Sequence, residues 1–483
     1  MTPRRALAWL IAASTAVRLA MAWAIGLGID ESYMVAAGRH FHAGYFDHPP
    51  LSWWLAAGAA HVFGSDGAII VRLPFILVFA LSTWLMFRLT ALLFDARAGF
   101  LAALAFNLSP VFGVTTGGWV LPDGPLICAL LAAGLCLAHA VSAGGWRWWL
   151  GAGAAAGLAL LSKYSAGLVL LGAFAALLTQ PRHRRLLATP PPWIAAGLAL
   201  LLFSPVVIWN ARHGWASFAF QGGRADIGRL HPLAPLAIFG GEAAFLLPWI
   251  WLGLMVEFVA ALRRGPGEWR GWLLAGLALV PVLLFAVVGL WSPHVLFHWA
   301  APGYLFLFPL LGARLARWPV PLLRRVAGAT AGLLVLGLVL VATEVRLNWL
   351  AVLAPGLDPG MQAVDWTPLG AALAARGLPG DAVLAGTGWS QTGKIDYALG
   401  GRFKVLCLNT DAREYALLTS PAESLGRDVL IITPREDSAA LAAAYRPLFA
   451  TVTPLAPAVL HFPFRGDIRF SLLLGHDLRR WPP

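Results

Sequence analysis

The sequence predicts a polytopic α-helical membrane protein that carries a small C-terminal α/β domain. Its 483 residues are 59% hydrophobic and only 12% charged, and their mean hydropathy is +0.73. A soluble domain carries about 25% charged residues. Apolar runs recur through the first two thirds of the chain, and a spanning helix needs about 20 mostly apolar residues. Lipid offers backbone groups no hydrogen-bond partners, so these runs should be helices.

Residues 1–343 should contain about eleven transmembrane helices. The two segments on either side of Lys163 are short, and could instead form one broken or tilted element. The first segment follows Arg4 and Arg5 like a signal peptide, but its apolar stretch is longer than usual and Arg18 interrupts it, which favours an uncleaved helix. The apolar segments lie near 6–28, 68–91, 98–116, 124–141, 148–161, 165–180, 193–209, 236–261, 271–290, 297–313 and 319–342.

The net charge of +12 does not indicate nucleic-acid binding. The arginines punctuate the gaps between apolar runs, and strongly basic gaps alternate with weakly basic ones, which is the positive-inside pattern. It predicts a cytoplasmic N-terminus. The first external loop, residues 29–67, and everything after about residue 344 should then lie on the opposite side of the membrane. The three cysteines have no metal-ligand spacing.

The composition changes after residue 344. Strand-like runs at 381–386, 403–409 and 428–433 alternate with helix-like stretches at 368–377 and 437–445. This alternation predicts an extracytoplasmic α/β domain over residues 344–483.

A dense polar cluster follows the first apolar segment directly. It contains the carboxylates of Asp30, Glu31 and Asp47 together with several histidines. Three carboxylates close together repel one another, and need a cation, a proton or a basic ligand to offset the repulsion. Two structural readings stand beside a catalytic one: Asp30 could cap a helix, and the two prolines after His48 could simply fix a rigid turn.

Further polar groups fall at the predicted external ends of later helices, so several loops should bring them to one face. Each has a structural alternative: Asp123 could cap the helix that follows it, Lys163 could extend to the interface, and the histidines could be packed side chains. Arg18 lies well inside the first segment, where a charge is costly and usually functional, an internal salt bridge being the alternative. The external groups are Asp123, Lys163, Arg212, Arg224, His294 and His298.

The order of these motifs resembles the integral-membrane glycosyltransferases of the GT-C fold. The closest likeness is to the bacterial branch of the dolichyl-phosphate-mannose protein mannosyltransferase superfamily, which includes the lipid A aminoarabinose transferases. The resemblance covers roughly residues 1–310. The residues that carry it are Asp30-Glu31-Ser32-Tyr33, Gly44-Tyr45-Phe46-Asp47-His48-Pro49-Pro50-Leu51, Val71-Arg72-Leu73-Pro74, Pro122-Asp123-Gly124-Pro125-Leu126, Leu161-Ser162-Lys163-Tyr164, Ser204-Pro205, Trp209-Asn210 and His298-Trp299.

The resemblance implies a polyprenyl-phosphate-linked sugar as donor and an acceptor on the external face. It also implies a bacterial inner membrane, with the active site and the C-terminal domain on the periplasmic side. It implies Asp30 as the catalytic carboxylate, with Glu31 and Asp47 beside it. The aminoarabinose transferases have a lysine after the second acid, whereas this chain has His48, so the sugar stays open. Residues expected to contact the substrates are Tyr33, Tyr45, His48, Arg72, Asp123 and His294.

The residues also suit this chemistry without the family. Transfer to a hydroxyl needs a base, which a carboxylate can supply, and the departing lipid phosphate needs cationic groups. The expected phosphate-binding residues are Lys163, Arg212, Arg224 and His298. A divalent cation held by Asp30 and Asp47 is a further option.

Three other functions stay open at this point. They are a transporter or flippase of a lipid-linked substrate, a glycan ligase or polymerase, and an assembly protein that binds a partner. The acceptor of a transferase could be lipid A, another envelope glycan, a lipid or a protein.

Overall fold

The computed structural model describes residues 2–224, 228–292, 295–419, 421–434 and 437–481. The chain divides into two compact units. The helical unit comprises Met1–Ala20, Ala43–Ser52 and Arg72–Val335. The mixed unit comprises Met21–His42, Trp53–Val71 and Leu336–Pro483. The mixed unit therefore joins the C-terminal residues to two segments from the first 71 residues.

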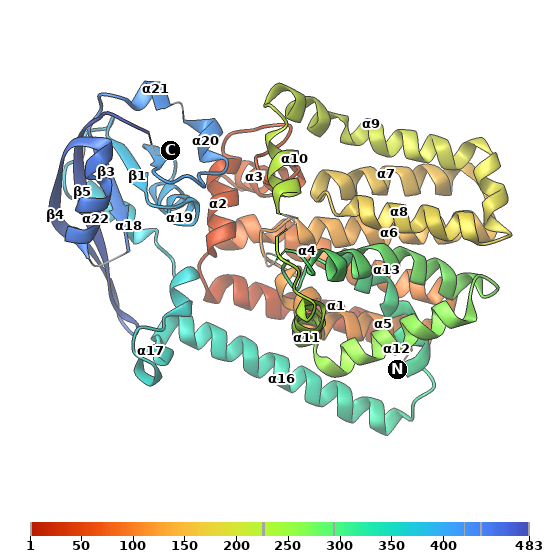
Figure 1. Cartoon of the computed structure of the whole chain (residues 1–483). Helices are drawn as coiled ribbons and strands as arrows, with labels where there is room; N and C mark the ends of the chain where they lie inside the picture. The colour runs from red at the N-terminus through yellow and green to blue at the C-terminus, as the bar shows by residue number, and fades with distance from the viewer. Residues whose placement is uncertain (1, 225–227, 293–294, 420, 435–436, 482–483) are drawn as a thin grey trace. The chain divides into compact units, whose positions relative to one another are not determined.

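Most of the first 347 residues are helical (Figure 1). Short π and 3-10 turns also occur at η1 (Val111–Thr115), η2 (His183–Ala188) and η3 (Leu305–Leu307). The α-helices are α1 (Pro3–Ala24), α2 (Ile29–Gly38), α3 (Leu51–Phe63), α4 (Ala68–Leu93), α5 (Ala96–Asn107), α6 (Asp123–Ala143), α7 (Trp146–Ser162), α8 (Ala166–Thr179), α9 (Pro190–Arg212), α10 (Ala216–Gly223), α11 (Ala234–Leu246), α12 (Pro248–Arg264), α13 (Trp269–Val288), α14 (Ala301–Tyr304), α15 (Phe308–Leu315) and α16 (Val320–Leu347).

Several of these helices identify a multi-pass membrane protein. Within the described residues, six are long and apolar enough to cross a membrane, or seven if the bent pair α11 and α12 forms one span. The expected count of about eleven is not confirmed. Each predicted segment does contain helix, but some helices are short: α8 has 14 residues, about 21 Å at 1.5 Å per residue, against a hydrocarbon core of about 30 Å.

Two predicted spans are interrupted in the structure. The segment 236–261 bends by 115° between α11 and α12, where Leu247 has φ +73° and Pro248 begins the second helix. Proline has no N–H to continue a helical ladder and disfavours helix in the residue before it. The segment 98–116 ends as α-helix at Asn107, and Pro110 then precedes the π turn η1. In both places a proline outweighs the apolar pattern.

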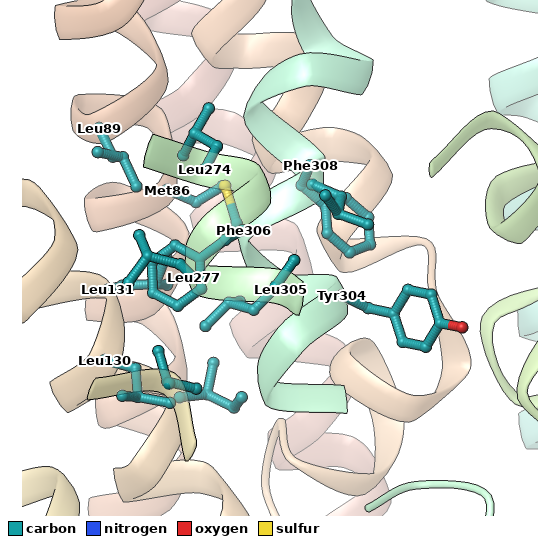
Figure 2. Packing of buried hydrophobic residues seen from close by; sticks show 14 of the residues in the cluster. Met86, Leu89, Leu130, Leu131, Leu274, Leu277, Tyr304, Leu305, Phe306 and Phe308 are labelled. Atoms are coloured by element: carbon teal, nitrogen blue, oxygen red, sulfur yellow. The ribbon is translucent and has the colours of Figure 1, made fainter. Parts of the chain in front are cut away.

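The helical unit has one extensive apolar core. Figure 2 shows side chains of α4, α6 and α13 converging on the segment that runs through α14, η3 and α15, among them Met86, Leu131 and Leu277 around Phe306. Phe106 stacks on Phe79 with ring centroids 5.0 Å apart. Apolar side chains from helices far apart in sequence thus fix the bundle.

Arg18 lies inside α1, and its contacts differ from the salt bridge considered for it. Its guanidinium donates to the carbonyl of Ser14 at 2.8 Å and to that of Gly113 in η1 at 2.7 Å. Its charge lies 4.0 Å from the centroid of the Phe79 ring, a favourable cation–π distance. The arginine therefore holds the π turn against α1 through two backbone oxygens and an aromatic face.

The mixed unit contains a five-stranded sheet in the order β2-β1-β3-β5-β4, drawn in blue in Figure 1. Strands β1, β2 and β3 pair in parallel, and β5 pairs antiparallel with both β3 and β4. The strands are β1 (Val383–Gly386), β2 (Lys404–Cys407), β3 (Val429–Thr433), β4 (Phe449–Phe462) and β5 (Gly466–Leu478). The other elements from residue 349 on are α17 (Trp349–Leu353), η4 (Pro359–Gln362), α18 (Pro368–Ala374), α19 (Trp389–Leu399), α20 (Tyr415–Leu418), α21 (Pro421–Ser424), α22 (Ser438–Tyr445) and η5 (Arg446–Leu448).

Alternating side chains of the sheet form two cores. Leu384 of β1 and Leu430 of β3 face α18 and α19, whereas Val429 and Ile431 of β3 face Leu441 of α22. This arrangement confirms a small C-terminal α/β domain with strands at the three predicted positions, while its predicted bounds and side of the membrane stay predictions. The hairpin of β4 and β5 was not predicted, because Pro454 and Pro457 interrupt β4 in sequence; prolines of this kind are confined to edge strands and bulges.

Two basic side chains join the residues on either side of α2 to the C-terminal residues within the mixed unit. Arg39 binds Asp66 at 2.7 Å and Asp396 at 3.3 Å. The buried ammonium of Lys394 donates to the carbonyls of Leu27 at 3.0 Å and Val364 at 2.8 Å. These contacts explain why the segment that carries Asp30 and Glu31 groups with the sheet.

Candidate active site

An ion pair between Asp123 and Lys163 lies at one end of the helical unit. The glycines 144 and 145, with φ +72° and +102°, separate α6 from α7, and the two helices pack along each other. The start of α6 and the end of α7 are therefore adjacent. Lys163 Nζ donates to both carboxylate oxygens of Asp123 at 3.0 Å, and the side chains are 14% and 13% exposed.

This pair argues against the structural alternatives considered for the two residues, and their functional roles stay predictions. Asp123 is the first residue of α6 after Pro122, and no side-chain hydrogen bond caps that helix. Lys163 ends α7 with its charge directed at the carboxylate. Asp123 therefore holds Lys163 in place instead of capping α6.

His298 interacts electrostatically with both members of this pair and with Arg224. The pKa of His298 is lowered to about 4, mainly by burial and also by the charges of Lys163 and Arg224, while the Asp123 carboxylate opposes the shift. The imidazole is therefore neutral near pH 7, and would serve as a hydrogen-bonding group. An anion bound beside it would raise its pKa again.

Aromatic rings position the Arg224 guanidinium. Its carbon lies 4.6 Å from the centroid of the Trp299 ring and 5.6 Å from that of Phe220. The backbone carbonyl of Arg224 also accepts a hydrogen bond from Ser292 at 3.1 Å. Arginine often binds phosphate while its planar face rests on an aromatic ring.

The segment 44–50 packs against α9 and α10. The Tyr45 amide donates to the His48 carbonyl at 3.2 Å, Gln221 donates to the Asp47 carbonyl, and Tyr45 and Asp47 are buried. A Cβ on Gly44 would lie 2.9 Å from the Trp209 ring, so this approach requires glycine. The segment is the rigid turn that its prolines suggested, and it also brings His48 close enough to act electrostatically on Asp123.

Several polar residues near this cluster were not predicted as site residues. The Tyr164 hydroxyl lies 2.7 Å from Ser217 Oγ, and Asn210 binds both Tyr164 at 3.5 Å and the Phe218 amide at 3.2 Å. Burial raises the pKa of Tyr164, and the Asp47 carboxylate acts in the same direction. Tyr164 and Asn210 belong to the motifs that carry the resemblance, so their presence was visible in the sequence, but their pairing was not.

Two other predicted residues have different surroundings, and the structure does not describe a third. Arg212 ends α9 and is exposed, and its side chain makes no ion pair in the described part of the chain. Arg72 is 2% exposed, within α4. His294 lies outside the described residues.

Asp30, Glu31 and Tyr33 belong to the mixed unit. Glu31 is buried, and its carboxylate accepts the Gly28 amide at 2.8 Å, which caps α2. Asp30 is exposed in the same first turn. The Tyr33 hydroxyl accepts the Glu414 amide at 3.2 Å, and its ring lies 5.4 Å from that of Trp389. The capping role considered for Asp30 thus falls to Glu31, and the catalytic roles stay predictions.

Among the residues whose placement is described, no group of three His, Cys, Asp or Glu side chains could hold a metal ion.

The family model of the dolichyl-phosphate-mannose-protein mannosyltransferases matches residues 47–209. ArnT from Cupriavidus metallidurans in the apo state is 16% identical, with a TM-score of 0.65 over 97% of this chain and 98% of that one. The chain has a GT-C fold. The same ArnT bound to undecaprenyl phosphate is 18% identical, with a TM-score of 0.64 over 97% of each chain. No curated protein gives a significant sequence match.

The GT-C fold confirms the resemblance read from the motifs. The family match begins at Asp47, in the second of the quoted motifs, and ends at Trp209, the ring that packs on Gly44. It therefore includes the segment 47–50, Asp123 and Lys163.

Proposed function

We propose that this protein transfers a sugar from a polyprenyl-phosphate-linked donor to an acceptor at the periplasmic face of a bacterial inner membrane. The observation that carries the proposal is the group of Lys163, His298 and Arg224, in which Lys163 binds Asp123 and His298 interacts electrostatically with the other three. It occurs in a fold that ArnT shares and in which ArnT binds undecaprenyl phosphate. A lipid-linked donor also accounts for a sugar enzyme that is so apolar.

In the proposed reaction an acceptor hydroxyl attacks the anomeric carbon of the sugar. The bond between that carbon and the phosphate oxygen breaks, and the electron pair leaves with polyprenyl phosphate. A carboxylate accepts the hydroxyl proton; Asp30 is the first candidate and Asp47 the second. A single displacement inverts the anomeric centre.

The departing phosphate gains negative charge, which Lys163 and Arg224 would stabilise. Both cations are positioned before the donor arrives, Lys163 by Asp123 and Arg224 by Trp299 and Phe220. Neutral His298 would add a hydrogen bond without adding charge repulsion between cations. Positioned charges act in advance of the reaction and need no reorganisation during it.

The test uses the full chain in nanodiscs with a panel of polyprenyl-phosphate sugars, with and without candidate acceptors. Mass spectrometry follows free polyprenyl phosphate. We expect release from one donor, and a loss of about 100-fold or more for the variant of the true base, Asp30→Asn or Asp47→Asn. The exposed Arg184→Gln variant is the matched charge control and should keep the wild-type rate.

Each outcome of the release experiment has one interpretation. Release from one donor that depends on acceptor names the sugar and supports transfer. No release from any donor, with every acceptor and divalent cation tried, contradicts transfer and favours the transporter function. Release at the full rate in both aspartate variants leaves transfer standing and removes both proposed bases.

A further inference from the structure

A cavity of about 680 Å³ lies in the helical unit between residues of α1, α4, α5 and α6. Arg4 and Arg88 are its cationic side chains, and His139 also lines it. Much of the remaining wall is apolar, with Leu7, Ile11 and Trp84 among its side chains.

The cavity is distinct from the candidate active site. His139 lies in the last turns of α6, whereas Asp123 is its first residue. The 21 residues of α6 span about 31 Å at 1.5 Å per residue, which is about the thickness of a hydrocarbon core. Arg4 near the start of α1 and Arg88 near the end of α4 mark the same end of the bundle as His139. This is the end predicted to face the cytoplasm.

The two arginines are available to an anion from outside the protein. Within the described residues, neither Arg4 nor Arg88 forms an ion pair, and both are exposed. The Arg88 guanidinium lies 5.0 Å from the centroid of the Trp84 ring, so one of its faces rests on an aromatic surface while its N–H groups stay free to donate at the edge.

The shape and chemistry of the cavity select its ligand. A phosphate ion alone would leave most of 680 Å³ unfilled and would make no use of the apolar wall. An amphiphile with an anionic phosphate head and an acyl chain matches both parts, and basic pockets between transmembrane helices bind such headgroups. Trp84 and Leu92 in the wall are 39% and 37% exposed, as side chains facing lipid would be.

We propose that this cavity binds an anionic phospholipid of the bilayer. Its phosphate lies between Arg4 and Arg88, and an acyl chain lies along the apolar side chains of α1 and α4. The site is separate from the proposed transfer reaction and does not depend on it.

Native mass spectrometry of the detergent-purified full chain tests the proposal. The probes are phosphatidylglycerol, phosphatidylcholine with the same acyl chains, and inorganic phosphate. We expect tight binding of one phosphatidylglycerol and weak binding of the other two. Arg4→Gln and Arg88→Gln should each weaken phosphatidylglycerol binding about fivefold, because one basic residue near a membrane surface contributes about 1 kcal/mol.

Two further variants separate lipid binding from a general change in charge or folding. Arg184→Gln removes one positive charge outside the cavity and should bind phosphatidylglycerol like wild type. Ala8→Trp keeps both arginines but adds bulk to the cavity wall at an exposed position, and should reduce binding about tenfold. Gel filtration checks that each variant is folded.

Three outcomes would overturn the proposal. Equal binding of the two lipids would show that the cavity does not distinguish an anionic headgroup from a zwitterionic one. Unchanged binding in folded Arg4→Gln and Arg88→Gln variants would place the lipid elsewhere. Binding of inorganic phosphate as tight as that of phosphatidylglycerol would identify a free anion as the ligand.

Discussion

The basic side chains at the two ends of α6 differ in whether a carboxylate of the protein pairs with them. At its start, the Lys163 ammonium is matched by the Asp123 carboxylate and is largely covered. Near its end, Arg4 and Arg88 line a cavity with no carboxylate bound to either within the described residues. A cation matched within the protein has a fixed position, whereas an unmatched cation can take its carboxylate or phosphate partner from outside the protein. Lys163 is thus a positioned charge, whereas Arg4 and Arg88 are charges available to an outside ligand.

The largest effect should come from removing the positioned cation. Lys163→Ala should lower the rate of polyprenyl-phosphate release by about 100-fold or more, because a fixed group that stabilises developing charge contributes at least that much. The rate is measured by mass spectrometry with saturating donor. Arg184→Gln, which changes net charge equally, should leave it unaltered. A folded Lys163→Ala protein that transfers at the wild-type rate would remove Lys163 from the site.

The next effect concerns stability at the same end. Asp123→Asn leaves the Lys163 ammonium largely covered and unmatched, and should cost about 3 kcal/mol, measured as a lowered melting temperature in detergent. Replacing both partners, with Asp123→Asn and Lys163→Met, should recover most of that loss while transfer stays absent. Recovery of transfer in the double variant would show that the pair is structural only.

A smaller effect should appear in the pH dependence of stability. The pKa of His298 is lowered from 6.5 to about 4, so the unfolded chain binds a proton more readily than the folded chain between these values. The folded state therefore loses stability as pH falls from about 6.5 towards 4. His298→Gln should lose less over that interval, measured as melting temperature against pH. Parallel curves for the two proteins would contradict the lowered pKa.

The smallest effect distinguishes the two ends by ionic strength. Raising salt from about 0.1 M to about 1 M shortens the Debye length from about 10 Å to about 3 Å. The preference for phosphatidylglycerol over phosphatidylcholine should shrink, because Arg4 and Arg88 are exposed. The melting-temperature cost of Asp123→Asn should change much less, because that pair is largely covered.

The sequence predicted the membrane class, the helical segments, three of the strands and the GT-C resemblance, but not that those three strands pair in parallel. Each of these follows from a local pattern: apolar length, strand-like runs, or a short motif. The residues around Lys163 were chosen for their chemical types and for the predicted side of the membrane. Their partners could not be predicted, because the approach of Asp123 to Lys163 depends on how α6 packs along α7.

Other features of the structure cannot be predicted from local sequence patterns, each for a different reason. The bend at Leu247 needs a left-handed backbone, which an apolar run does not reveal. Asp30 and Glu31 are adjacent acids that the sequence alone does not tell apart, yet the Glu31 carboxylate accepts the Gly28 amide whereas Asp30 is exposed. The edge strand β4 is hidden by its prolines, since proline usually argues against a strand.

Those prolines affect whether separate copies of the protein associate through the edges of their sheets. An open strand at the rim of a sheet can recruit the strand of another copy and so begin a growing β aggregate. One rim of this sheet is β2, which has only 4 residues. The other rim is β4, where Pro454 and Pro457 lack amide hydrogens and the register shifts between Leu455 and Ala458. Neither rim offers a continuous template, so copies crowded together in a membrane resist polymerising through their sheets.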